Sequence, residues 1–191
     1  MIEHYWYAEI LKELRGRLSE KRFLHSVSTE KTAFKLAVRY GADCDKVRTA
    51  ALFHDITKDT QLNEQLNLCE KYGIMVDNLE MKDVKLIHSK TAVAVAFNEF
   101  NITDADILDA VKYHTTGRKN MSLIEKIIFL ADYIEPLRGE YDGVAELRLL
   151  AYEDIDKAML FALELTVKEV EKKKKELHGA TLTAYYFYKR I

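Results

Sequence analysis

Helix breakers are scarce in this chain: its 191 residues include a single proline, Pro136, and only seven glycines. Proline removes a backbone donor and clashes with the preceding turn of a helix, and β-rich folds place glycine and proline at frequent turns. Hydrophobic residues make up 48% of the chain, which is enough for one sizeable core at this length. The sequence therefore predicts an all-α fold that forms one compact domain over residues 1–191.

Apolar residues recur at steps of three and four along most of the chain, which is the period of an amphipathic helix. This spacing predicts a first helix over residues 3–18 and a second over 22–40, with His25 in its first turn. A third predicted helix runs from residue 43 or 45 to the His54-Asp55 pair, and four more follow over 60–72, 82–99, 103–114 and 122–134. Residues 144–177 are predicted to form two helices with a break near 152–154, and a last helix covers 181–190.

Cap residues mark several of the predicted helix ends. Gly41 and Asn101 stand where a helix would end, and Asp43 or Asp45 can cap the following helix. The further predicted caps are Thr60, a shortened capping box of Thr103 with Asp106, and a full capping box of Ser122 with Glu125.

Charge, cysteine usage and hydropathy exclude several classes of function. A formal net charge of -2 gives no electrostatic reason to expect a nucleic acid polymer as partner. Cys44 and Cys69 have no nearby cysteine partner, so neither a disulfide framework nor a zinc cluster is indicated. The first residues lack a signal-peptide pattern, and no apolar run reaches membrane-spanning length. We expect a cytoplasmic protein with no membrane partner; the aromatic run 185–188 leaves a homodimer open.

A histidine and an aspartate stand side by side at the end of the apolar run 50–53. Alone, the His54-Asp55 dipeptide is a weak signal, but His25, His88 and His114 also lie in or beside predicted helices. Asp132 lies within the most apolar predicted helix, where an ionised carboxylate costs several kcal/mol unless it is paired or binds a metal. Imidazole and carboxylate donors without thiolate indicate a divalent ion: iron, manganese, zinc or magnesium.

The order of these residues on successive helices resembles the HD-domain metal-dependent phosphohydrolases. The stretches 25–27, 50–58, 114–117 and 129–138 resemble one branch more closely, the YqeK-type symmetrical diadenosine tetraphosphate hydrolases. The resemblance implies a helical bundle with a metal-site core at about 20–140 and C-terminal packing helices at about 143–191. It implies an ion, iron first, bound by His25, His54, Asp55 and Asp132, with His88 and His114 at a second metal position or on phosphate.

The resemblance also implies the reaction, in which a metal-bound water attacks phosphorus at the middle of diadenosine tetraphosphate and two ADP are released. The substrate would then be a dinucleoside polyphosphate. The residues expected to be catalytic are Asp55, Lys58, His88 and His114, and those expected to bind substrate are Lys58, Thr115, Thr116, Gly117 and Arg138. Lysine binds phosphate as a point charge and arginine by a two-pronged fork.

The residues near the expected site distinguish this chain from related enzymes that act on other substrates. Alarmone hydrolases of the guanosine tetraphosphate type carry an acidic pair after His-Asp, whereas this chain has Lys58-Asp59. The cyclic-dinucleotide branch carries a Gly-Tyr-Pro signature, which is absent here because Pro136 follows Glu135. A phosphohydrolase of other (deoxy)nucleotides remains the main alternative, and a non-catalytic module that senses nucleotides is the other.

Overall fold

The computed structural model describes residues 4–191, and that range contains ten α-helices and no β-strand. The predicted all-α fold is confirmed, although residue 3, where the first helix was expected to begin, lies outside the described residues. In chain order the elements are α1 (His4–Arg17), α2 (Glu20–Tyr40), α3 (Cys44–Phe53), α4 (Leu62–Lys71), η1 (Glu80–Lys82), α5 (Val84–Phe100), α6 (Ala105–Tyr113), α7 (Leu123–Ile134), η2 (Pro136–Arg138), α8 (Val144–Glu153), α9 (Ile155–Lys172) and α10 (Gly179–Tyr188).

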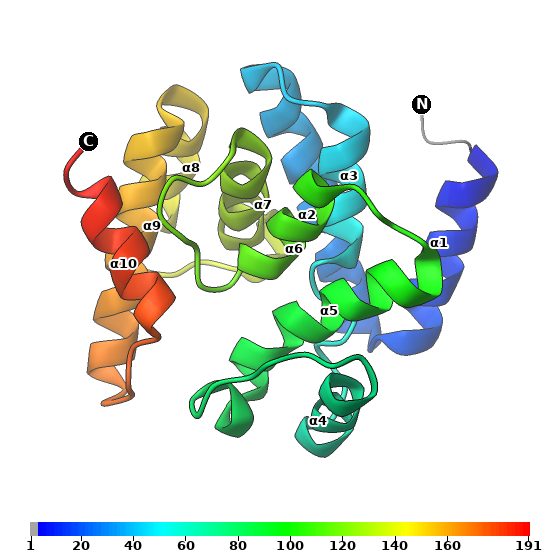
Figure 1. Cartoon of the computed structure of the whole chain (residues 1–191). Coiled ribbons are helices and arrows are strands. Elements are labelled where there is room, and N and C mark those ends of the chain that lie inside the picture. The colour runs from blue at the N-terminus through cyan, green and yellow to red at the C-terminus, as the bar shows by residue number, and fades with distance from the viewer. Residues whose placement is uncertain (1–3) are drawn as a thin grey trace.

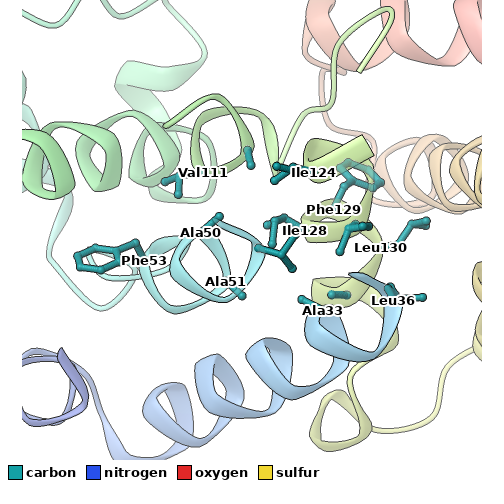
Figure 2. Close-up of a cluster of buried hydrophobic side chains, with 14 of the residues drawn as sticks. Ala33, Leu36, Ala50, Ala51, Phe53, Val111, Ile124, Ile128, Phe129 and Leu130 are labelled. Atoms are coloured by element: carbon teal, nitrogen blue, oxygen red, sulfur yellow. The ribbon is translucent and has the colours of Figure 1, made fainter. Parts of the chain in front are cut away.

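The centre of the fold is formed by α2, α3, α6 and α7, with α1 and α10 on opposite sides of the view in Figure 1. Apolar side chains from these four helices meet in one cluster (Figure 2), and Ala50 and Ala51 of α3 are fully buried in it. Such small side chains let neighbouring backbones approach closely. The packing brings the C-terminal ends of α3 and α6 close to the interior faces of α2, α5 and α7.

Most of the predicted caps are confirmed. Gly41 and Asn101 end α2 and α5 in the left-handed conformation, with φ of 70° and 53°. Asp43 caps α3 by accepting hydrogen bonds from two backbone N–H groups. At α7, Ser122 and Glu125 form the complete capping box. These ends are settled by local hydrogen bonds, which explains why the sequence reveals them.

Three local predictions were wrong. Gln61, not Thr60, precedes α4, and its side chain makes no capping hydrogen bond. Asp104, not Thr103, caps α6, because its carboxylate accepts hydrogen bonds from the backbone N–H groups of Asp106 and Ile107. His25 lies in the second turn of α2, since that helix begins at Glu20 behind a Ser19 cap.

The C-terminal part of the chain follows the predicted pattern. Asp154 caps α9 and separates it from α8, which confirms the predicted break. On α10, Tyr188 is buried, whereas Tyr186 is half exposed. Cys44 and Cys69 are free thiols, as expected. Among the described helices, none combines the length and the apolar character that crossing a membrane requires.

Candidate metal centre

Six side chains from five parts of the fold converge at the centre of the bundle. His54 ends α3 and Asp55 lies in the turn that follows, whereas the other four come from helices far apart in the sequence. These four are His25 on α2, His88 on α5, His114 at the end of α6 and Asp132 on α7. All except Asp132 are buried, and the Asp132 side chain is only 13% exposed. The structure therefore brings together every residue that the sequence indicated as a metal ligand.

Asp55 stands at the middle of this group, with one oxygen towards each half of it. Its Oδ2 lies 3.6 Å from His25 Nε2 and 3.5 Å from His54 Nε2. Its Oδ1 lies 3.1 Å from His88 Nε2 and 3.5 Å from His114 Nε2. Asp132 Oδ1 closes the first half, at 3.0 Å from His25 Nε2. A carboxylate in this position can serve two adjacent ion positions.

Backbone acceptors fix how two of the imidazoles are oriented. The Nδ1 atom of His54 lies 2.6 Å from the carbonyl oxygen of Ala51, and Nδ1 of His114 lies 2.7 Å from that of Val111. A carbonyl oxygen only accepts, so each Nδ1 carries the proton and each Nε2 presents its lone pair to the interior. This is the arrangement of histidines that bind metals.

The atoms that face one another here are poorly satisfied by the protein itself. His54 Nε2 and Asp55 Oδ1 are buried and make no hydrogen bond with any part of residues 4–191. Leaving such atoms without a partner costs about 1–3 kcal/mol each. Three overlapping triads of donors, each within 4.8 Å, could hold an ion at this point. Nitrogen and oxygen donors in this number and spacing fit a divalent metal.

The protonation states also suit a cation site. Burial by itself would raise the pKa of the Asp132 carboxyl, but the charge of Arg138 and the His25 hydrogen bond hold it well below its usual range. The pKa of Asp55 is likewise lowered against burial, by His54 and Lys58. Burial lowers the pKa of His88 to about 3. Two ionised carboxylates beside a neutral imidazole are in the form that metals bind.

His25 differs from the other histidines because carboxylates surround it. Burial would lower its pKa, but hydrogen bonds to Asp132 and Glu135 raise it to about 9. A proton on this ring must leave before Nε2 can bind a metal. We therefore expect metal affinity to rise with pH and metal uptake to release a proton.

A cavity of about 600 Å³ opens onto the site, and three of the five Lys and Arg side chains that line it contact the clustered His and Asp residues. Arg22 Nη1 donates to Asp55 Oδ2 at 2.7 Å, and Arg138 Nη1 donates to Asp132 Oδ1 at 2.5 Å. Lys58 Nζ lies 2.9 Å from His88 Nε2. Lys58 and Arg138 were predicted from the sequence. Arg22 was missed, although its position one turn before His25 was an available signal.

The predicted loop residues 115–117 divide into two groups. Thr115 Oγ1 lies 3.3 Å from His88 Nε2 and 3.1 Å from His114 Nε2, so it belongs to the cluster. Thr116 donates its hydroxyl to the carbonyl oxygen of Gly117. Gly117 has φ of +65°, and a Cβ there would meet Ala184 of α10 at 3.4 Å. The structure does not bring Thr116 and Gly117 to the cavity, because the turn directs them into packing.

Glu135 is a second residue that the sequence reading missed as part of the site. Its side chain is fully buried, Oε1 lies 2.8 Å from His25 Nδ1, and Oε2 accepts from the Leu137 N–H. A carboxylate behind a metal-binding histidine orients the ring and increases its basicity. The available signal was an acidic residue one turn after Asp132, directly before the only proline.

A Glu135→Gln protein is expected to bind a divalent ion about 10–100-fold more weakly, which is the usual effect of losing such a carboxylate. The amide keeps the shape but cannot supply the negative charge behind His25. The measurement is calorimetric titration of the chelator-treated protein with Mn²⁺. Glu140→Gln is the matched control, because Glu140 is exposed and pairs only with Arg148 among the described residues. Equal affinities of the two variants would contradict the role of Glu135.

Comparisons with known proteins agree with this arrangement. The HD domain family matches residues 22–137. The symmetrical bis(5'-nucleosyl)-tetraphosphatase of Halalkalibacterium halodurans is 39% identical over 175 residues, covering 92% of each chain. The protein of the same name from Bacillus subtilis is 36% identical over 177 residues, covering 93% of this chain and 94% of its own. A crystal structure from Clostridium acetobutylicum, described as a predicted HD superfamily hydrolase involved in NAD metabolism, superimposes with a TM-score of 0.92 at 38% identity, covering 96% of this chain and 97% of that one.

Proposed function

This chain belongs to the HD domain family, and on that premise we propose that it is a metal-dependent hydrolase that cleaves diadenosine tetraphosphate symmetrically into two ADP. Relatives that match over more than nine-tenths of both chains carry the name of this activity. The donor set at the centre of the bundle supports the same chemistry. The names of the relatives support the choice of substrate, and the geometry of the site supports metal-dependent hydrolysis as the class of reaction.

The observation that carries the proposal is the position of Asp55 between two groups of histidines. His25, His54, Asp55 and Asp132 would hold the principal ion. His88 and His114 would share Asp55 with a second ion, or would contact a phosphate oxygen directly. A divalent ion bound there supplies positive charge to the phosphate oxygens and acidifies water for the attack on phosphorus. Iron is our first expectation for its identity, with manganese, magnesium and zinc as alternatives.

The cations of the cavity would neutralise the polyphosphate. Arg22 and Arg138 each use one nitrogen on a carboxylate, and a guanidinium has five N–H donors, so further donors are left for phosphate oxygens. Lys58 adds a third positive group beside His88. Its pKa is lowered because it is buried. Thr115 can donate its hydroxyl at the same place.

The departing ADP is stabilised more by nearby positive charge than by a proton donor. Cleavage at the middle of the tetraphosphate releases ADP through an oxygen of its terminal phosphate, and phosphate groups of this kind have a second pKa of about 6. Such a group leaves as an anion near pH 7, so a strong proton donor would contribute little. Arg22, Lys58 and Arg138 then act by stabilising the charge that develops as the bond breaks.

The test is product analysis with the metal-loaded protein. Diadenosine tetraphosphate, deoxynucleoside triphosphates and guanosine alarmones are incubated separately, and the products are separated by chromatography. We expect ADP as the sole product of the dinucleotide and slow or no turnover of the others. Release of AMP with ATP, or turnover of triphosphates alone, would contradict the proposal. Metal bound without turnover of any nucleotide would favour a sensing module.

Two finer expectations stay predictions. Iron in the protein as purified is checked by elemental analysis of the same preparation. A homodimer, which the aromatic run 185–188 left open, is checked by sedimentation; the half-exposed ring of Tyr186 is the most exposed of that run.

A further inference from the structure

A second cavity lies beside the one that opens onto the metal centre. Its volume is about 490 Å³, and its wall is formed by the last turn of α7, by the segment between Arg138 and Asp142, and by one face of α9. Tyr133, Tyr141 and Leu165 give it an aromatic and aliphatic lining, and Lys168 lies at the same surface. Pockets of about 300–1,000 Å³ accept ligands of the size of a nucleoside.

The two cavities share a wall. Arg138 lines both of them, and Tyr133 directly follows the metal-centre residue Asp132 in α7. Glu169 of the second cavity has a lowered pKa, mainly through its hydrogen bond with Lys173, with contributions from Lys85 and Arg138. Lys85 lines the first cavity, so charges on the two sides interact across the wall. Arg138, which faces both cavities, is therefore placed to contact phosphates from either side.

The aromatic groups of the second cavity are held firmly by their hydroxyl groups. Tyr141 donates its hydroxyl to the carbonyl oxygen of Tyr133 at 2.8 Å, and the Tyr133 hydroxyl lies 2.5 Å from Thr166 Oγ1. The guanidinium of Arg138 lies 5.2 Å from the centre of the Tyr133 ring. Since the Tyr133 ring also stacks on Phe129 at 5.2 Å between ring centres, the half-buried ring of Tyr141 is the one left to offer a face to a ligand. Stacking of a nucleobase on such a ring is a common and sequence-tolerant mode of binding.

We propose that the second cavity binds one nucleoside of the dinucleotide while the metal-centre cavity binds the other, with Arg138 contacting the phosphates between them. Leu24 and Leu137, which are 43% and 61% exposed at the first cavity, offer the apolar contact for the nucleoside on that side. This inference rests on the proposed function, because only a substrate with two nucleosides needs two such places. It also accounts for cleavage at the middle, since a nucleoside held on each side places the central bond at the metal centre.

Lys168 fits the phosphate side of this subsite. It is exposed and makes no ion pair within residues 4–191, so its charge is free to act on a ligand. The substrate carries several negative charges, and a cation at the cavity would attract the half that enters there.

Photolabelling locates the bases directly. The probe is diadenosine tetraphosphate with 8-azidoadenine in place of both bases, irradiated on the metal-loaded full chain and mapped by mass spectrometry of peptides. We expect labelled peptides from both cavities, one set around Leu24 or Leu137 and one around Tyr141 or residues 165–172. Label confined to the first set would overturn the inference.

Kinetics of variants gives a second, independent readout. Tyr141→Ala is expected to raise KM for diadenosine tetraphosphate about tenfold, the scale of one lost base stack, with a much smaller change in kcat. Tyr141→Phe keeps the ring and should restore most of the KM. Lys168→Glu, an exposed change that leaves the core intact, should also raise KM, whereas Lys119→Glu, an exposed control away from both cavities, should not.

The outcomes separate this inference from the proposed function. If the wild-type protein releases no ADP from the unmodified dinucleotide, the proposed function fails. If ADP is released but Tyr141→Ala and Lys168→Glu have the wild-type KM, the function stands and the second subsite is refuted.

Discussion

An Asp55→Asn protein is expected to lose at least about 10³-fold in kcat for diadenosine tetraphosphate. Asp55 faces His25 and His54 with one oxygen and His88 and His114 with the other. An amide keeps the volume but removes the negative charge that both groups share. A bound metal contributes several kcal/mol to transition-state stabilisation, and each 1.36 kcal/mol corresponds to about tenfold in rate.

The matching measurements are kcat with excess Mn²⁺ and the metal content after gel filtration. Asp59→Asn is the matched control, because the same change four residues later affects an exposed side chain that accepts the Ser19 N–H, and an amide oxygen can still accept it. Circular dichroism should give the same helical signal for both variants. An Asp55→Asn protein that keeps wild-type metal content and turnover would show that the donor set has been assigned wrongly.

A Phe53→Ala protein is expected to lose about 3–5 kcal/mol of unfolding free energy, the usual cost of removing a buried phenylalanine. The Phe53 ring is fully buried and packs edge-on against Phe100 at 4.9 Å between ring centres. For a chain of this size the loss corresponds to a fall in Tm of roughly 6–20 °C. Because Phe53 directly precedes His54, the cavity also loosens the end of α3, and metal affinity should fall with stability.

Urea unfolding followed by circular dichroism measures this loss in the chelator-treated protein, so that metal binding does not contribute. Phe97→Ala is the control: it removes the same ring from a side chain that is 49% exposed on α5. We expect it to change the unfolding free energy by far less. Equal losses in the two variants would show that the core around α3 can close over the missing ring.

The helices were largely predictable because their signals are local. The Ser122 capping box, the Gly41 end of α2 and the break before Asp154 each depend on residues within one or two turns. The errors at Thr60 and Thr103 concern which of two neighbouring polar residues caps a helix. That choice depends on small differences in backbone geometry, which a list of residues does not contain.

The sequence indicated most of the residues that form the site, but not how each of them is placed within it. The order of four histidines and two aspartates identified the donor set through a family resemblance. Arg22 and Glu135 were missed because an arginine or glutamate near a helix end is usually solvated, and only the packing of α2 on α7 brings Glu135 against His25. Thr116 was expected at the phosphates, but its hydroxyl is engaged by the backbone of its own turn.

By itself the sequence determined that the chain is helical, through the spacing of its apolar residues, and its resemblance to a known family indicated the six candidate metal ligands. Only the tertiary structure decided that Asp55 stands between two pairs of histidines and that Arg138 separates two cavities. Helix formation is governed by contacts within a few residues, whereas these positions depend on how α2, α5, α6 and α7 pack against one another. A shift of one of these helices along its axis by one turn would leave the sequence unchanged but would move its donor atom about 5 Å away from the others.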